Sequence, residues 1–133
     1  MILLPLITGK LKVLVVDDSL IVSNRLRNLL SDLEYVQFTG HAENYNDALL
    51  FTDAMKPHVL LLDININGRS GIEILKQVKK DYPSIKVIMF TNQSDERYRK
   101  MCQESGADYF LDKSSEFESL TGLLEKIYEI TTW

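Results

Sequence analysis

Side chains able to bind a metal ion or a phosphoryl group follow four of the apolar runs in this sequence. Asp17 and Asp18 follow the first run, Asp63 the third, Thr91 the fourth and Lys113 the fifth. One Asp after a strand is usually a helix cap, so a single position says little. Three carboxylates that met without a cation would be driven toward protonation, so a shared divalent ion is their most economical explanation. Because the candidate ligands are all oxygens, we expect Mg²⁺.

The same residues have the chemistry that phosphoryl transfer to a carboxylate requires, because the migrating group carries its charge on its equatorial oxygens. Asp63 would be the nucleophile. Mg²⁺ would bridge Asp63 to the phosphoryl group, the Lys113 ammonium would face a second oxygen, and the Thr91 hydroxyl would donate a hydrogen bond to a third. We therefore predict a phosphoryl-accepting site, if the fold brings these positions together.

The apolar runs that must position these residues recur at intervals of 23 to 26 residues, beginning near Leu11, Val36, Val59, Ile85 and Tyr109. The first, third and fourth runs are almost continuously aliphatic or aromatic, as expected of strands covered on both faces. The second run alternates apolar and polar residues, which favours an edge strand with one wetter face.

Helical patterns separate these runs. Leucines recur at helical spacing before the second run, and the clearest pattern is an apolar stripe that predicts a helix over about residues 115–131. The expected boundary residues are N-caps at Ser19, Asn44 and Ser94 or Asp95, and a C-terminal stop at Gly106.

Five strands that alternate with five helices predict a doubly wound α/β fold, with a five-stranded parallel sheet, right-handed crossovers and helices on both faces. Leucine-rich repeats have a similar period, but their Leu-x-x-Leu-x-Leu frame and Asn ladder are absent. Open parallel sheets bind ligands beyond the carboxyl ends of their strands, and the candidate residues occupy these ends.

The composition describes one globular domain. The chain has 133 residues, a net charge of −4 and 45% hydrophobic residues, and no Lys/Arg-rich run that would indicate nucleic-acid binding by this chain alone. Cys102 is the only cysteine, so an internal disulfide is excluded, and we read it as a small helix residue. His41 and His58 have no partner at metal-ligand spacing and are expected in edge or loop positions.

Residues 1–10 form an apolar lead-in. They lack a basic region and a cleavage site, and Lys10 and Lys12 interrupt them well before the roughly 18 apolar residues that a membrane span needs. We expect no membrane association. The lead-in is left with three readings, namely an extra piece of strand, a cap on another subunit, or an artefact of expression.

The five-point set at the strand ends resembles the receiver domain of bacterial response regulators, over about residues 11–131. The similarity extends to the stretch Asp63–Gly71, which has a glycine eight residues beyond the acceptor, and to Gly106-Ala107-Asp108. The resemblance implies the flavodoxin-like strand order 2-1-3-4-5, an order documented for a receiver protein.

The resemblance also assigns roles. It makes Asp63 the phosphorylation site, Asp18 a direct Mg²⁺ ligand, Asp17 a ligand acting through water, and the backbone carbonyl of Asn65 a further ligand. Lys113 keeps the role of phosphoryl-binding ammonium.

Two switch residues follow from the same resemblance, the hydroxyl of Thr91 and the aromatic ring of Phe110. They would couple phosphorylation to a face made by the fourth helix, fifth strand and fifth helix. That face would contact a downstream protein, through Arg97, Arg99 or Lys100 on the fourth helix, and the resemblance leaves open a homodimer there.

The sequence departs from the family pattern at three positions. Asn67 and Ser114 stand where Pro is common, and Asn92 stands where a small residue usually follows the switch threonine. A cis bond between Lys113 and Ser114 would cost roughly 2.5 to 4 kcal/mol, so we expect it to be trans. Asn92 should narrow access to the phosphoryl group and alter the rates at which the aspartyl phosphate forms or hydrolyses.

The expected function is therefore that of a cytoplasmic response regulator, phosphorylated by a sensor histidine kinase or a phosphotransfer protein. It would be a switch rather than an enzyme proper, and either a stand-alone receiver or a fragment of a longer regulator. Two alternatives to this function are an interaction module that works without phosphorylation, and an Asp-nucleophile phosphatase. The second normally needs an Asp where Asn65 stands.

Overall fold

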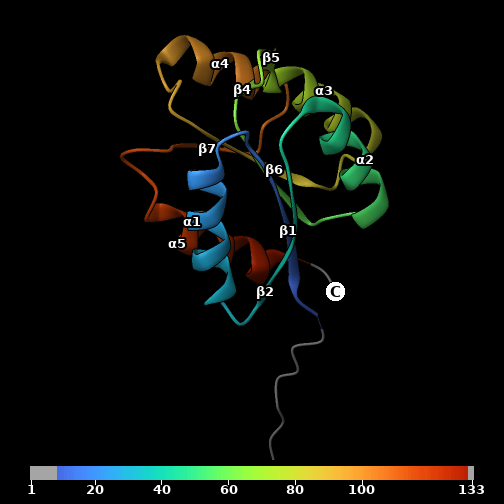
Figure 1. The fold of residues 1–133 in the computed structure, drawn as a ribbon, viewed down its shortest axis with the longest axis vertical. Helices are drawn as coiled ribbons and strands as arrows, with labels where there is room; N and C mark the ends of the chain where they lie inside the picture. Colours follow the sequence, from blue (N-terminus) through green and yellow to red (C-terminus); the bar gives the residue numbers. More distant parts are fainter. Residues whose placement is uncertain (1–8, 132–133) are drawn as a thin grey trace, which may run out of the picture.

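A computed structural model describes residues 9–131 as a parallel sheet between two layers of helices (Figure 1). The main sheet contains β1 (Leu11–Val16), β2 (Val36–Ala42), β3 (Val59–Leu62), β6 (Lys86–Thr91) and β7 (Tyr109–Asp112). Their order is β2-β1-β3-β6-β7, and every neighbouring pair is parallel. Counted along the chain within this sheet, the order is 2-1-3-4-5, so the predicted doubly wound fold is confirmed.

Five helices cover the sheet: α1 (Leu20–Ser31), α2 (Tyr45–Met55), α3 (Gly71–Asp81), α4 (Glu96–Glu104) and α5 (Ser119–Ile130). Helices α1 and α5 pack on one face, and α2, α3 and α4 pack on the other (Figure 1). None of the helices in residues 9–131 is long and apolar enough to cross a membrane.

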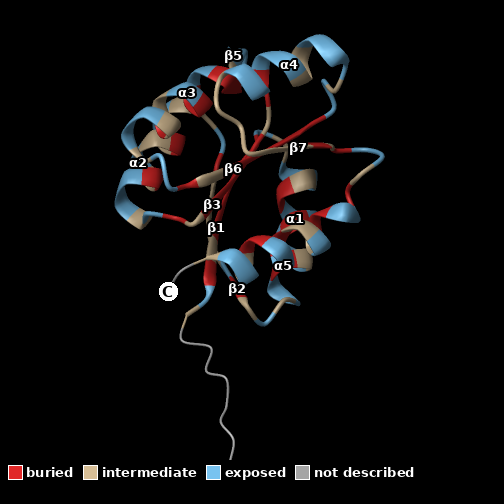
Figure 2. Cartoon of the chain, turned by 180° about the vertical axis from the view of Figure 1, so that it is seen from behind, coloured by how far each residue is buried: buried red, intermediate tan, exposed pale blue. Residues whose placement is uncertain are grey.

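The central strands face both helix layers, which explains their aliphatic composition. In β1, Val13 and Val15 face the α1/α5 layer, whereas Leu14 and Val16 face the other layer. Successive side chains of a strand point to opposite faces, so both sets are buried (Figure 2). Each fully buried aliphatic side chain contributes about 1.5–3 kcal/mol, so the sheet is a firm base for the loops at its edge.

The predicted helix boundaries are largely correct. The side chains of Ser19, Asn44 and Asp95 each accept a hydrogen bond from the backbone N–H three residues later, and so cap α1, α2 and α4. Asp95, not Ser94, is the cap of α4. Gly106 follows α4 with φ of 103°, a left-handed conformation that glycine adopts without strain.

The last helix begins later than predicted. It starts at Ser119 rather than near residue 115, because the preceding segment is held in a turn. The Asp112 carboxylate accepts the backbone N–H groups of Ser114 and Ser115, at 2.8 Å each, and the Glu116 carboxylate accepts the N–H of Asp112 at 2.9 Å. These side-chain bonds compete with helix formation, which the apolar stripe alone does not reveal.

A small antiparallel hairpin lies between β3 and α3 and was not predicted. Its strands, β4 (Asn65–Ile66) and β5 (Arg69–Ser70), have two residues each, too few for any periodicity to be visible. The turn between them contains Asn67 and Gly68, both with positive φ. Most of the apolar lead-in, residues 1–8, lies outside the described residues.

Candidate functional site

The strand register brings the predicted site residues to one edge of the sheet. Val16 of β1 is paired with Leu62 of β3, so Asp17 and Asp63 follow side by side, and the Asp63 N–H donates to the Val16 carbonyl at 3.1 Å. On the other side, Thr91 ends β6 and the N–H of Lys113 donates to its carbonyl at 2.9 Å. The parallel strand order therefore collects residues far apart in sequence.

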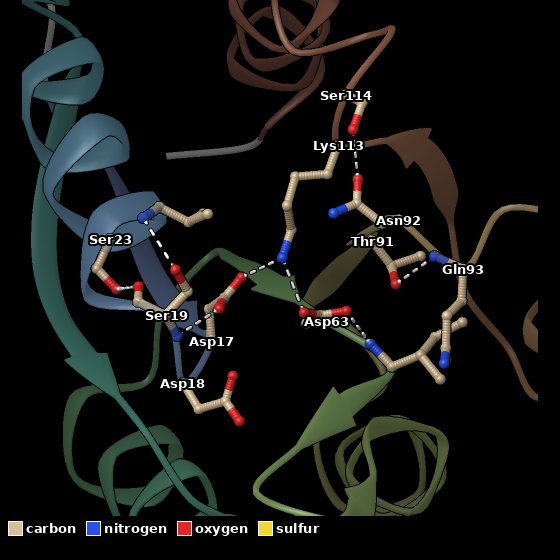
Figure 3. Close-up of polar contacts among 12 residues, drawn as sticks. Asp17, Asp18, Ser19, Ser23, Asp63, Thr91, Asn92, Gln93, Lys113 and Ser114 are labelled. Atoms are coloured by element: carbon tan, nitrogen blue, oxygen red, sulfur yellow. Dashed lines mark hydrogen bonds and ion pairs between the residues drawn. The ribbon is translucent and has the colours of Figure 1, made fainter.

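Lys113 links two of the carboxylates (Figure 3). Its ammonium group donates to Asp17 Oδ2 at 2.6 Å and to Asp63 Oδ2 at 2.8 Å. Lys113 is 8% exposed and Asp17 is 2% exposed, so these bonds form in a largely desolvated place. The predicted meeting of Asp17, Asp63 and Lys113 is thus present in the structure.

The electrostatics of this group follow from burial and from the ion pairs. Burial alone would lower the pKa of Lys113, but the hydrogen bonds to Asp17 and Asp63 outweigh it and raise that pKa. Burial raises the pKa of Asp17, and the hydrogen bonds from Lys113 and the Ser19 N–H offset part of that rise. Lys113 is therefore charged at neutral pH and compensates part of the acidic charge around it.

The backbone of Asp17 has a side-chain partner that the sequence did not indicate. The Asp17 carbonyl lies 2.7 Å from His41 Nε2, which is also 2.6 Å from the Ser23 hydroxyl. That hydroxyl donates to the Ser19 carbonyl at 2.9 Å, so the His41 ring nitrogen acts as donor to both. His41 lies on the edge strand β2, as expected, but it also fixes the turn that carries the acidic pair.

Asp18 contacts the hairpin formed by β4 and β5, and not Lys113. Its Oδ2 accepts the backbone N–H of Asn67 at 2.7 Å, and the Asn67 side-chain amide donates to the Glu43 carbonyl at 2.8 Å. Asn67 has φ of 49°, a left-handed conformation that Asn tolerates better than most residues. Proline has no N–H and a fixed negative φ, so only a non-proline residue can make this contact.

The three carboxylates do not surround one point in this arrangement. Within residues 9–131, no three Asp, Glu, His or Cys side chains are placed to hold a metal ion together. The expected convergence is met by Asp17 and Asp63 but not by Asp18, because Asp18 contacts Asn67 instead. The donor set still fits Mg²⁺ by its chemistry, since it has three carboxylates against one ammonium. Asn65, whose carbonyl was predicted as a ligand, lies in β4, two residues after Asp63.

The loop that follows β6 and the loop that follows β7 are joined by a hydrogen bond. Thr91 is fully buried, and its Oγ1 accepts the Gln93 N–H at 3.1 Å. Next to it, Asn92 Oδ1 accepts the hydroxyl of Ser114 at 2.7 Å (Figure 3). Residues 9–131 contain no cis peptide bond, so the Lys113–Ser114 bond is trans, as predicted. Two departures from the family pattern, 22 residues apart, are therefore in direct contact.

Phe110 occupies a half-buried position on β7 and packs against the core on the α2/α3/α4 side. The guanidinium of Arg99 lies 4.6 Å from the centre of its ring and also donates to Glu116 Oε1 at 3.3 Å. Of the three cations expected to contact a partner, Arg99 is therefore engaged within the chain. Arg97 and Lys100 are exposed.

Comparisons with known proteins agree with this geometry. A family model described as "Response regulator receiver domain" matches residues 13–125. The chain is 29% identical over 119 residues to the response regulator protein VraR of Staphylococcus epidermidis, covering 90% of this chain and 57% of VraR. It is 28% identical to the response regulator GacA of Pseudomonas aeruginosa, covering 89% of this chain and 55% of GacA. The chain thus spans little more than half the length of these relatives.

A solved structure has the same fold and a similar length. The response regulator domain of Thermotoga maritima CheB superposes with a TM-score of 0.79 at 28% identity. The match covers 92% of this chain and 99% of the CheB chain.

Proposed function

Since the chain belongs to the response regulator receiver domain family of two-component systems, we propose that it is a phosphorylation-controlled switch with Asp63 as the phosphoryl acceptor. The observation that carries this proposal is the ammonium of Lys113, which lies 2.6 Å from Asp17 and 2.8 Å from Asp63 in a nearly buried position. A fixed positive charge beside a carboxylate at a strand end is well placed to stabilise a group that carries negative charge to that carboxylate.

The donor would be a phosphohistidine of a sensor histidine kinase or of a phosphotransfer protein. An oxygen of Asp63 attacks phosphorus, the P–O bond forms as the P–N bond breaks, and the leaving imidazole takes up a proton. Lys113 supports the charge on one phosphoryl oxygen. Thr91 Oγ1 accepts the Gln93 N–H, which leaves its hydroxyl hydrogen able to donate to another phosphoryl oxygen.

The residues proposed to hold Mg²⁺ are Asp18 directly, Asp17 through water, Asp63, and the carbonyl of Asn65. When bound, the ion would neutralise charge between the acceptor and the incoming phosphoryl group. The contribution of this chain is to keep Asp17 in place, through the Ser19 N–H at 2.8 Å and through His41, and to present an excess of carboxylates over ammonium groups.

The output of the switch is proposed to be the face formed by α4, β7 and α5. Thr91 and Phe110 lie on adjacent strands, and Phe110 lies beneath Arg99 of α4, so a change at the acceptor has a short path to this face. A downstream protein or a second copy of the chain would bind there. The chain would assist its own phosphorylation and dephosphorylation in the cytoplasm, but its product is a conformational change, so it is not classed as an enzyme.

The alternative within the same family is an interaction module that works without phosphorylation. The presence of the complete five-residue set disfavours it, namely Asp17, Asp18, Asp63, Thr91 and Lys113. A phosphatase is disfavoured by Asn65, whose amide cannot act as the acid and base that such enzymes place two residues after the nucleophile.

The test is intact-mass spectrometry after incubation with acetyl phosphate and Mg²⁺. We expect one phosphoryl adduct, lost when a chelator is added and absent from Asp63→Asn. Asp47→Asn, which removes a carboxylate of α2 instead, should be labelled like the wild type. A folded wild-type protein that acquires no adduct would favour the phosphorylation-independent module.

A further inference from the structure

The amide of Asn92 is fixed in orientation by Ser114. Asn92 follows β6 and Ser114 follows Lys113, so their hydrogen bond of 2.7 Å joins the loop before α4 to the loop before α5. The Ser114 hydroxyl donates to Oδ1 of the amide. Because the amide is planar, this bond also determines where its two N–H donors point.

Those donors lie on the side of Lys113, whose ammonium contacts Asp63. In Figure 3 the amide oxygen of Asn92 is turned to Ser114, whereas its nitrogen is on the side of the Lys113 side chain. None of residues 9–131 accepts a hydrogen bond from this nitrogen. Asn92 and Ser114 are both exposed, so a group that arrives from solvent can reach these donors.

We infer that Asn92 is a further catalytic residue, whose side-chain nitrogen donates a hydrogen bond to the phosphoryl group that Asp63 accepts, and that Ser114 is its positioning residue. This inference rests on the proposed function. The transferring phosphoryl group spreads its charge over three equatorial oxygens, and a donor that is already oriented needs no reorganisation during the reaction. Thr91 and Asn92 would then approach the group from the end of β6, and Lys113 from the end of β7.

A purely structural reading is that the Asn92–Ser114 bond ties two loops together and nothing more. The two readings differ in what each variant changes. If the bond only joins the two loops, it contributes to stability, and substitution of either Asn92 or Ser114 should lower the stability equally. An oriented donor contributes to the maximal rate of transfer, and the hydroxyl of residue 114 matters only while Asn92 is present.

The experiment measures the rate of phosphorylation by phosphoramidate at saturating Mg²⁺, as a function of donor concentration. Phosphoramidate has the P–N bond of a phosphohistidine without a protein attached. We expect Asn92→Ala to lower the maximal rate about tenfold, less than the typical loss for a fully enclosed oxyanion donor, because Asn92 itself is exposed. Ser114→Ala should lower it about threefold, and Ser114→Thr, which keeps the hydroxyl, should restore most of the rate.

The double variant Asn92→Ala/Ser114→Ala decides between the readings. If Ser114 acts through Asn92, the double variant reacts at the rate of Asn92→Ala alone. Asn46→Ala on the exposed face of α2 is the matched control and should leave the rate unchanged.

Three results would overturn the inference while leaving Asp63 as the acceptor. They are rates equal to the wild type in all variants, a faster Asn92→Ala variant, as expected if the side chain only narrows access, and effects of the two residues that multiply in the double variant. Thermal unfolding of each variant shows whether the fold is intact. A wild-type protein that is not phosphorylated at all would instead overturn the proposed function itself.

Discussion

A Cβ atom on Gly71 would lie 1.9 Å from the carbonyl oxygen of Asp63. Gly71 is the first residue of α3, and its N–H donates to the carbonyl of Ile64, so the start of this helix lies directly on the backbone of the proposed acceptor. The glycine eight residues after the acceptor is therefore required by close approach. A glycine is not needed at position 71 for a turn or for an unusual φ.

Gly71→Ala should consequently disturb both stability and phosphorylation. Either α3 or Asp63 must move, and overpacking of this kind costs about 1–3 kcal/mol in the free energy of unfolding. Urea denaturation measures the loss. Gly122→Ala is the matched control, because a Cβ there meets nothing within 4 Å and the position is inside α5, where alanine should add about 0.5–1 kcal/mol. A Gly71→Ala protein as stable as the wild type would contradict the close approach.

The thiol of Cys102 should be inert in the folded protein. Its side chain is fully buried, and burial raises its pKa to about 11. At pH 8 the thiol is therefore neither accessible to a reagent nor ionised. Iodoacetamide followed by mass spectrometry should give no adduct in buffer and a complete adduct in guanidinium chloride. Ser84→Cys, at an exposed turn, provides a reactive control. Rapid alkylation of native Cys102 would show that α4 opens readily.

The ion pair between Lys79 and Asp108 lies at the amino end of the strands, away from the site. It should stabilise the fold without affecting phosphorylation. Asp108 Oδ2 accepts Lys79 Nζ and the N–H of Val87, each at 2.9 Å, and Lys79 also donates to the Ile85 carbonyl at 2.9 Å. Asp108→Asn should lower the free energy of unfolding by about 1–3 kcal/mol, because it weakens charge-assisted bonds to groups that are partly buried. Glu104→Gln, at an exposed position on α4, is the control. An Asp108→Asn protein that keeps its stability but loses phosphorylation would show that the ion pair serves the site rather than the stability of the fold.

The free energy of unfolding should depend on pH through the carboxyl group of Asp112, which accepts hydrogen bonds from the turn before α5. A hydrogen bond from the Ser94 hydroxyl and others from the N–H groups of Ser115 and Ser114 lower the pKa of Asp112 to about 2. A carboxyl whose pKa is lowered by folding stabilises the native state above its ordinary pKa near 4, and loses this contribution as the pH falls toward 2.

Asp112→Asn should therefore be less stable than the wild type at pH 6, and the difference should shrink as the pH falls from about 4 toward 2. Urea denaturation at several pH values measures it. A difference that stays constant over this range would mean that the Asp112 charge does not matter to the turn.

The sequence was sufficient to predict the sheet, because its central strands are covered on both faces and so consist of continuous apolar runs. It was also sufficient to select Asp17, Asp18, Asp63, Thr91 and Lys113 as candidates, because each ends a strand or follows one within two residues. Position relative to a strand is a local property, and it can be read without knowing any contact.

Contacts between loops could not be predicted in this way. The bonds between Asn92 and Ser114, and between Asp18 and the Asn67 N–H, join residues 22 and 49 positions apart, with no periodicity to relate them. The late start of α5 was missed for a related reason. An apolar stripe records which face is buried, but the carboxylate of Asp112 decides where the backbone becomes helical.

The most direct test of the central claim is to identify the phosphorylated residue. After phosphorylation with acetyl phosphate and Mg²⁺, borohydride reduction converts an aspartyl phosphate to homoserine, which tandem mass spectrometry of the peptides can locate. The account predicts homoserine at position 63 and at no other Asp. Homoserine at position 17 or 18, or an unreduced phosphate on a hydroxyl residue such as Thr91, would contradict it.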